Sequence, residues 1–183
     1  MNWDSLLADL ESRFEAERRA DLAAQSADLA EAEVSRIRMA DRLRGAPGRR
    51  VLLRTRSGAH VDGVVVRAED GFVLVDEGEG LQAIVPVEAL AIAGPLPGPA
   101  PRGETWRTPT FQGALRELAR VGARVRVVLS GGELVGRIVR VGADWFDVVV
   151  DAAEAGARKS ATAPVDGGVV TVALGAVEAV RSR

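Results

Sequence analysis

The sequence predicts an α+β protein, mainly β, in which an N-terminal helical arm precedes two tandem five-stranded small β-barrels. Residues 2–44 contain no glycine or proline and are rich in strong helix formers. From residue 49 the apolar period changes to two, which is typical of short strands. The pattern LLRTRSGAHVDGVVVRAEDGFVLV of residues 52–75 then returns as VVLSGGELVGRIVRVGADWFDVVV at 127–150. The helical segment followed by two similar sets of strands predicts an arm followed by two similar barrels.

Residues 1–45 form the predicted arm, which is one long helix or a helical hairpin broken near Ala20. Gly45 and the proline two residues later are a stop signal. Two apolar stripes with helical steps lie out of register with each other, so the arm either packs on its own chain or forms a dimer helix. The stripe predicted to mediate association is Trp3, Leu7, Leu10 and Phe14.

Residues 46–94 form the first predicted barrel. Val51, Leu53 and Thr55 alternate with Leu52, Arg54 and Arg56, which predicts one buried and one exposed face. Further strands follow at 61–65, 72–75, 82–86 and 91–93, with a single helical turn at 87–90. Five short strands are too few for two stacked sheets, so a small barrel is the most economical arrangement.

Residues 95–108 form a predicted linker, because four prolines alternate with glycines and favour an extended spacer. Trp106 lies in this segment among polar residues, where an aromatic side chain either packs back onto a domain or anchors a partner. Trp106 is therefore a second candidate interaction residue.

Residues 109–183 form a predicted short helix followed by the second barrel. Thr108 and Pro109 are the expected N-cap and first helical residue of a helix that runs through Arg120. Gly136 repeats the position of Gly63 and is expected to tolerate a sharp strand bend. Residues 152–168 have few bulky apolar side chains and predict a mobile loop before a strand at 169–172.

The second unit resembles the Sm-like fold, whose glycine pattern SH3-like barrels share. The resemblance rests on V-x-V-x-L, a glycine turn, a second glycine and an Asp-aromatic pair, which stand here at 125–138 and 144–148. The whole chain also resembles uncharacterised actinobacterial proteins that begin with a Trp-Asp pair and a Leu-rich helix, sometimes labelled Fis-like regulators. The sequence contains no helix-turn-helix pattern that would match that label.

The Sm-like resemblance implies ring assembly through paired edge strands and binding of single-stranded RNA. The family reads RNA with an asparagine after the Asp-aromatic stretch and with an Arg-Gly pair in the last motif. Asp147 or Val148 stands where the asparagine falls, and the last motif is Val-Glu-Ala-Val at 177–180. An acidic side chain repels phosphates, so these departures argue against the family's RNA pocket.

The charge distribution predicts no strongly basic segment. The net charges are −3 for residues 1–45, −2 for 46–94, +2 for 95–122 and +1 for 123–183. A local phosphate-binding surface would need clustered Arg or Lys. The candidate RNA-binding residues are Arg54, Arg56, Arg124, Arg126, Arg137 and Arg140, with Trp145 available for stacking. The alternative is that these arginines only solvate an exposed face.

The composition excludes several classes of site. The chain has no cysteine, so disulfides, thiolate nucleophiles and the usual zinc sites are absent. No phosphate loop or nucleophile motif occurs, and the single histidine, His60, follows a turn without the partners of a catalytic base. We therefore expect no catalytic residue, metal, cofactor or small-molecule substrate. Apolar runs are too short for a membrane span and no signal peptide is recognisable, so a cytoplasmic location is expected.

The sequence thus predicts a non-enzymatic binding or assembly module. The first hypothesis is a protein-interaction scaffold that binds a protein partner or further copies of itself. The alternative is an RNA-binding Sm-like adaptor that uses the outer-face arginines.

Overall fold

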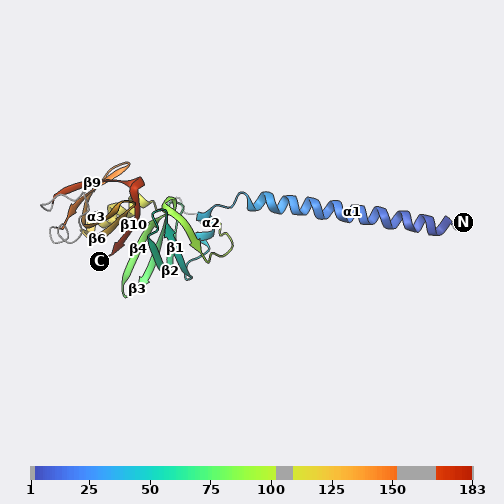
Figure 1. The fold of residues 1–183 in the computed structure, drawn as a ribbon, viewed down its shortest axis with the longest axis horizontal. Coiled ribbons are helices and arrows are strands. Elements are labelled where there is room, and N and C mark those ends of the chain that lie inside the picture. Colours follow the sequence, from blue (N-terminus) through green and yellow to red (C-terminus); the bar gives the residue numbers. More distant parts are fainter. Residues whose placement is uncertain (1–2, 102–108, 152–167, 183) are drawn as a thin grey trace. The chain divides into compact units, whose positions relative to one another are not determined.

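The structure is a computed structural model that describes residues 3–101, 109–151 and 168–182 (Figure 1). The side chains of residues 3–11 and 20 lie outside this description. The chain divides into two compact units, Met1–Arg38 and Met39–Arg183. The first unit contains one helix and the second contains all of the strands.

Helix α1 (Trp3–Val34) is a single helix, with no break at Ala20. Its described side chains are all exposed, including Phe14 at 67% and Leu29 at 69%. Long single helices depend on packing of an apolar face for most of their stability. The described apolar side chains of α1, such as Phe14 and Leu29, are therefore not packed within their own unit.

The predicted helix does not continue without interruption to residue 44. It breaks at residues 35–38, and a short helix, α2 (Met39–Arg44), follows within the second unit. Leu43 of α2 is fully buried in the hydrophobic core formed by the first set of strands. Burial of this leucine outweighs the weak preference of the sequence for a continuous helix.

Ten strands make up one antiparallel sheet. The first five are β1 (Arg50–Thr55), β2 (His60–Ala68), β3 (Phe72–Gly78), β4 (Leu81–Pro86) and β5 (Leu90–Gly94). The second five are β6 (Arg124–Leu129), β7 (Gly132–Val141), β8 (Trp145–Val150), β9 (Val169–Ala173) and β10 (Val177–Ser182). A single 3-10 turn precedes β5 at Val87–Ala89 and precedes β10 at Leu174–Ala176. The predicted strands and helical turns are confirmed within one to three residues.

The sheet contains the same arrangement twice. Its strand order is β5-β1-β2-β3-β4-β10-β6-β7-β8-β9, so each half has its fifth strand beside its first. The two halves are joined by β4 and β10, which lie side by side (Figure 1). The repeat seen in the sequence is therefore a structural duplication.

The prediction of two closed barrels is not confirmed. In neither half does the fourth strand pair with the fifth strand of the same half, so the sheet stays open. The physical reason in the first half is that the edge of β4 is occupied by β10 from the second half. Each half nevertheless surrounds its own hydrophobic core, the first around Leu53 and Val73 and the second around Phe146 and Val127.

The repeated glycines mark the same close approach in both halves. A Cβ atom on Gly63 would lie 2.1 Å from the carbonyl oxygen of Asp76. A Cβ atom on Gly136 would lie 2.1 Å from the carbonyl oxygen of Val149. Only glycine therefore permits β2 and β7 to cross the neighbouring strand so closely, which gives both glycines a structural role.

Helix α3 (Phe111–Val121) begins later than predicted. Its N-cap is Thr110, whose side chain accepts a hydrogen bond from the amide of Gly113 at 3.0 Å. The predicted N-cap, Thr108, lies outside the described residues, and Pro109 precedes the helix. Threonine is a favoured N-cap residue, and the hydrogen bond from Gly113 identifies Thr110 as the cap of α3.

The described part of the predicted linker, residues 95–101, lies against α2. The Arg42 guanidinium donates hydrogen bonds to the carbonyl oxygens of Leu96 and Pro97, at 2.9 and 3.1 Å. The amide of Ala100 donates to the carbonyl oxygen of Asp41 at 2.9 Å. This stretch is therefore tied to the first half instead of forming a free spacer.

Candidate functional site

The junction between β4 and β10 is the most distinctive arrangement in the second unit. Val180 lies opposite Ile84 and Arg181 lies opposite Ala83 in an antiparallel register. Only these two residue pairs align, so the backbone ladder is short. Side-chain contacts must therefore supply much of the specificity of this junction.

A buried carboxylate joins the two halves. Glu178, 5% exposed, accepts a hydrogen bond from the Thr55 hydroxyl at 2.7 Å and from the Ser57 amide at 3.0 Å. The Ser57 hydroxyl donates a third hydrogen bond to the same carboxylate. Both carboxylate oxygens are thus satisfied by Thr55 at the end of β1 and by Ser57 in the turn that follows, which makes burial of the charge tolerable.

The environment of Glu178 favours its ionised form. Burial alone raises the pKa of this carboxyl group. Hydrogen bonds from Ser57 and Thr55, and the nearby positive charge of Arg56, more than offset burial and hold the pKa below its ordinary value of 4.5. The carboxylate is therefore charged at neutral pH and stabilises the junction as an anion.

A second polar contact crosses the same junction. The guanidinium of Arg181 on β10 donates two hydrogen bonds to the Glu77 carboxylate on β3, at 2.9 and 3.0 Å. It also donates to the carbonyl oxygen of His60. A two-pronged contact of this kind requires a defined geometry, so it restricts the register of β10 on β4.

The strand pairings establish which residues of the two halves are equivalent. Thr55 pairs with Leu90, and Leu129 pairs with Val177, each immediately beside a bulge. The bulge residues are Ala91 in the first half and Glu178 in the second. Ala91 therefore occupies in β5 the position that Glu178 occupies in β10.

The edge of β9 is open in the described part of the chain. Val170 and Thr171 of β9 correspond to Ala83 and Ile84 of β4. The first pair lies opposite Val148 and Asp147 of β8, and the second pair lies opposite the equivalent Val75 and Leu74 of β3. No described strand pairs with β9 on its other side. A groove of about 300 Å³ lies there. Its lining comes from the β6–β7 turn, from β9 and from the following 3-10 turn: Leu129, Ser130, Glu133, Thr171, Val172 and Ala176.

The edge of β5 is the other open end of the sheet. Ile92 on this strand is 55% exposed, whereas the equivalent Ala179 on β10 is 1% exposed. Val180 is 2% exposed, and its equivalent, Ala93, is half-buried. The difference arises because β10 is covered by β4 and β5 has no second strand beside it among the described residues.

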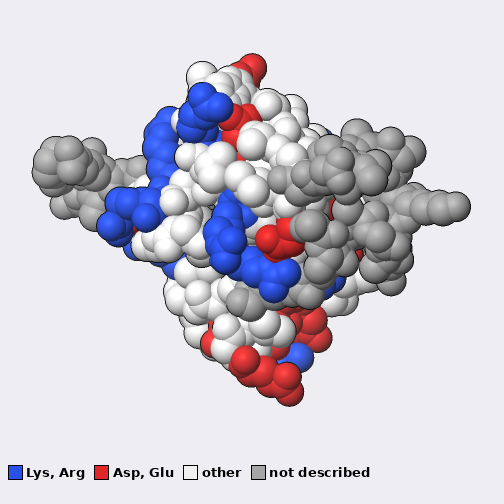
Figure 2. Space-filling view, turned by 90° about the vertical axis from the view of Figure 1, so that its left-hand side faces the viewer, with Lys and Arg blue, Asp and Glu red and all other residues white. Residues whose placement is uncertain are grey.

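The predicted RNA-binding arginines lie in both halves of the sheet, and in the second half Arg124 lies directly opposite Arg137 on the neighbouring strand. Three of them pair with carboxylates: Arg124 with Asp151, Arg126 with Glu133 and Arg140 with Asp147. The remaining three, Arg54, Arg56 and Arg137, are exposed. On the face drawn in Figure 2, basic side chains are interspersed with neutral surface and with acidic side chains.

Trp145 and Phe146 have different environments. Phe146 is fully buried in the second core, whereas Trp145 is 36% exposed. Alternation along β8 turns one aromatic ring inward and the next outward. Trp145 borders a shallow pocket that also contains Arg140, Asp144, Asp147 and Thr171.

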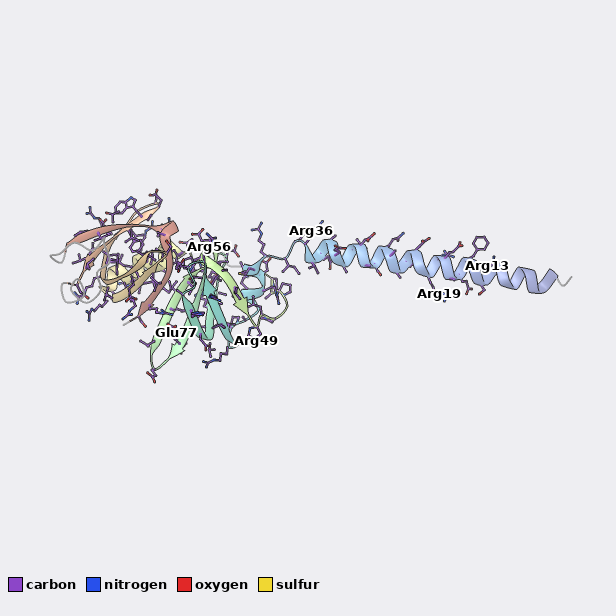
Figure 3. The ribbon with its side chains drawn as sticks, in the orientation of Figure 1. Arg13, Arg19, Arg36, Arg49, Arg56 and Glu77 are labelled. Carbon is purple, nitrogen blue, oxygen red and sulfur yellow. The ribbon has the colours of Figure 1, made fainter. Side chains whose placement is uncertain are left out.

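The predicted interaction residues of the arm are only partly described. Trp3, Leu7 and Leu10 lie in α1, but their side chains fall outside the described residues, as does all of Trp106. Phe14 is exposed, and charged side chains such as Arg13 and Arg19 project from the same helix (Figure 3). The exposed ring of Phe14 could therefore contact a partner.

The sequence reasoning missed the junction residues Glu178, Thr55, Ser57, Arg181 and Glu77. One signal was present, because Glu178 is the only charged residue in the apolar run Val177–Val180. A charge at that position of a strand requires a partner once the strand is buried. The partner lies 123 residues earlier, so no local pattern could identify it.

The described residues contain no group of three or more His, Asp or Glu side chains that could hold a metal ion. No described helix is both long enough and apolar enough to cross a membrane. No protein-family model matches the sequence, and no curated protein matches it.

Proposed function

We propose that this chain is a non-enzymatic assembly module, a protein-interaction scaffold that joins further copies of itself through the open edges of β5 and β9. It would be built on two tandem Sm-like small barrels, each left open where the sheet continues or ends. The observation that carries the proposal is the pairing of β4 with β10. In this pairing the fourth strand of the first half already accepts the fifth strand of the second half.

The composition of the open edges supports this proposal. Strand β9 reads VVTVA and strand β5 reads LAIAG, so neither contains a charged residue. Proteins that remain monomeric usually protect an edge strand with lysine, with inward-pointing charges or with a covering element. Val169 on β9 and Ile92 on β5 are both more than half exposed. These edges therefore favour strand addition.

Helix α1 supplies a second route to association. Phe14, Leu22 and Leu29 are each more than 60% exposed along it. The predicted stripe of Trp3, Leu7, Leu10 and Phe14 would add to this surface. An isolated helix gains stability when its apolar residues pack against a partner, so association through α1 would also order the helix.

The test measures the mass of the full-length chain as a function of concentration by sedimentation equilibrium. One variant carries Ile92→Lys and Val169→Lys at the two edges, and a second carries Phe14→Lys in the arm. Val121→Lys is the matched control, because Val121 is 62% exposed at the end of α3 and lies on neither edge nor arm. We expect the wild type to self-associate and the edge variant to dissociate.

Two results would argue against the proposal. A wild-type protein that stays monomeric at every concentration would contradict the proposed self-assembly. An edge variant with the mass of the wild type would assign assembly to another surface, and a loss confined to Phe14→Lys would identify that surface as α1.

RNA binding is the second candidate function, and one observation favours it. Trp145 is exposed beside Arg140 and Thr171, so a nucleobase stacked on the indole would meet hydrogen-bonding groups. Arg54, Arg56 and Arg137 are exposed and could contact phosphates. The carboxylates of Asp144 and Asp147 oppose this function, because they border the same pocket.

Fluorescence anisotropy with labelled single-stranded RNA tests this candidate at low and at near-physiological salt. Binding that weakens steeply with salt and is lost in Trp145→Ala would support it. Arg124→Ala with Arg126→Ala should weaken binding and flatten its salt dependence, and Arg120→Ala is the control for a lost positive charge, because Arg120 lies on α3 outside the candidate residues. No binding at low salt would exclude the RNA function.

A further inference from the structure

We infer that α1 pairs with the α1 of a second copy in the antiparallel direction, with Phe14 of one helix against Leu29 of the other. This inference rests on the proposed self-association, and it specifies the partner and the direction of the route through α1. It concerns residues 12–34, whose side chains are all described except that of Ala20.

One stripe of α1 carries three large apolar side chains that are exposed. Phe14, Leu22 and Leu29 are 67%, 61% and 69% exposed. At about 100° per residue, these three fall within about 80° of one another around the helix, together with Arg18 and Gln25. These five residues, called the seam below, span about 22 Å at about 1.5 Å per residue. Packing of the seam against a partner would stabilise the helix.

The charge of α1 differs between its two ends, and this difference indicates what covers the seam. Residues 12–19 contain three arginines and two glutamates, a net charge of +1. Residues 21–34 contain four carboxylates and no basic residue, a net charge of −4. The arginines are Arg13, Arg18 and Arg19, and the carboxylates of the second segment belong to Asp21, Asp28, Glu31 and Glu33. Each segment of one helix therefore attracts the other segment of a second copy.

These charges oppose a parallel pair of helices. A parallel pair would set the two acidic segments side by side, with four carboxylates from each copy and no cation between them. It would also place Arg18 of one copy against Arg18 of the other, and like charges in contact are unfavourable. An antiparallel pair sets each arginine-bearing segment against an acidic one and opposes the two helix macrodipoles. The antiparallel direction is therefore favoured.

The apolar residues of the seam determine the register. With a two-fold axis between Asp21 and Leu22, Phe14 of each copy lies opposite Leu29 of the other, and the two Leu22 side chains meet beside the axis. A shift of about one helical turn would place Phe14 opposite Gln25 or Glu33 instead. The apolar contact occurs twice and closes the pair, as in any isologous interface.

The same register gives Arg18 a partner on the other helix. Arg18 lies opposite Gln25 of the second copy and between Asp21 and Asp28 of that copy, which are about 4–6 Å away along the axis at about 1.5 Å per residue. The methylene groups of the arginine can pack on the seam while its guanidinium donates to either carboxylate. A charged residue is thereby accommodated within an apolar stripe.

Spin labels on the full-length chain test the direction of the pair. The chain has no cysteine of its own, so Ser12→Cys and Ala30→Cys each give one labelling site at an exposed position of α1. Both positions lie about 115° around the helix from the centre of the seam, so the labels leave the contact intact. Pulsed electron paramagnetic resonance measures the label distances in each variant alone and in an equal mixture of the two.

We expect the mixture to contain a short distance that neither variant shows alone. In the inferred register, Ser12 of one copy and Ala30 of the other lie at nearly the same height. Two Ser12 or two Ala30 residues are separated by about 25–29 Å along the axis, at about 1.5 Å per residue. A parallel pair gives the reverse order, with the short distances in the unmixed samples.

Charge reversal tests the contact of Arg18. Arg18→Glu should weaken self-association in sedimentation equilibrium by about tenfold, because the pair loses two attractive contacts and gains two repulsive ones. Adding Asp28→Arg should restore most of the affinity. Arg18 and Asp28 are about 15 Å apart on one helix, so this rescue acts only between copies. Arg49→Glu is the matched control, because it makes the same charge change at an exposed residue of the second unit.

The outcomes separate the inference from the proposed function. A wild type that never self-associates would overturn both. A wild type that associates while the labels show the parallel order, or show no distance between α1 helices, would overturn the inference and leave the assembly function standing. A double variant that remains as weak as Arg18→Glu would do the same. A short distance in the mixture together with rescue by Asp28→Arg is the result we expect.

Discussion

Glu178 on the last strand accepts a hydrogen bond from Thr55 at the end of the first strand, at 2.7 Å. The two residues are separated by 123 positions and belong to different halves of the duplicated sheet. Both residues are buried, and the Glu178 carboxylate is the charged partner of the contact. This single relationship couples the stability of the two halves.

Replacing Glu178 should destabilise the second unit. Glu178→Ala removes the acceptor of three hydrogen bonds and should lower the free energy of unfolding by about 2–3 kcal/mol. Glu178→Gln retains the volume and should cost less. Urea denaturation followed by circular dichroism measures both changes. Glu88→Gln is the control, because Glu88 is exposed in the turn before β5. Equal midpoints for all variants would contradict a structural role for Glu178.

The stability of the junction should depend on pH. The folded-state pKa of Glu178 lies below its ordinary value of 4.5, so its contribution is fully present above that value. The contribution is lost as the pH falls through the folded-state pKa. The urea midpoint should therefore decrease more steeply in the wild type than in Glu178→Gln as the pH falls below 4.5. Parallel curves would show that the carboxylate has no favourable interaction in the folded state.

Alanine at either repeated glycine should be strongly destabilising. Gly63→Ala and Gly136→Ala each place a Cβ atom 2.1 Å from a backbone carbonyl oxygen, which forces the strands apart. We expect a loss of more than about 2 kcal/mol for each, within the range for severe overpacking. Gly71→Ala has open space around the new Cβ atom and serves as the control. Thermal denaturation compares the three, and a tolerated Gly136→Ala would contradict the close approach.

The two adjacent aromatic residues should respond differently to truncation. Phe146→Ala creates a cavity in the second core and should cost about 3–5 kcal/mol. Trp145→Ala removes a partly exposed side chain and should cost much less, with most of the fluorescence change arising from the lost indole. Chemical denaturation of both variants measures the difference. Similar losses of stability would mean that Trp145 packs more tightly than its exposure indicates.

Truncation should separate the arm from α2. Removal of residues 1–34 should leave the unfolding free energy of the second unit nearly unchanged, because every described side chain of α1 is exposed. Removal of residues 1–45 also removes Leu43 from the first core and should cost at least about 2–5 kcal/mol, as for a buried leucine cut to alanine. Differential scanning calorimetry of the two chains checks this. An equal loss on both truncations would place part of the arm's stabilising surface before residue 35.

Local pattern predicted most of the elements of this protein. The glycine-free, alanine-rich segment predicted α1, and the period of two predicted the strands and which side of β1 is buried. The repeat predicted the duplication, since equivalent turns and glycines recur at one spacing. These features depend on neighbouring residues, and short-range steric and propensity effects are encoded within a few positions of the chain.

Tertiary structure decided how the strands join and which side chains form the site. Whether β4 closes on its own half or pairs with β10 depends on Glu178 meeting Thr55 and on Arg181 meeting Glu77, contacts between segments more than 100 residues apart. The break before α2 was likewise decided by burial of Leu43 in the first core. Periodicity specifies the direction of a side chain relative to its own strand and leaves its distant partner unspecified, because that partner is selected by packing and electrostatics in the folded chain.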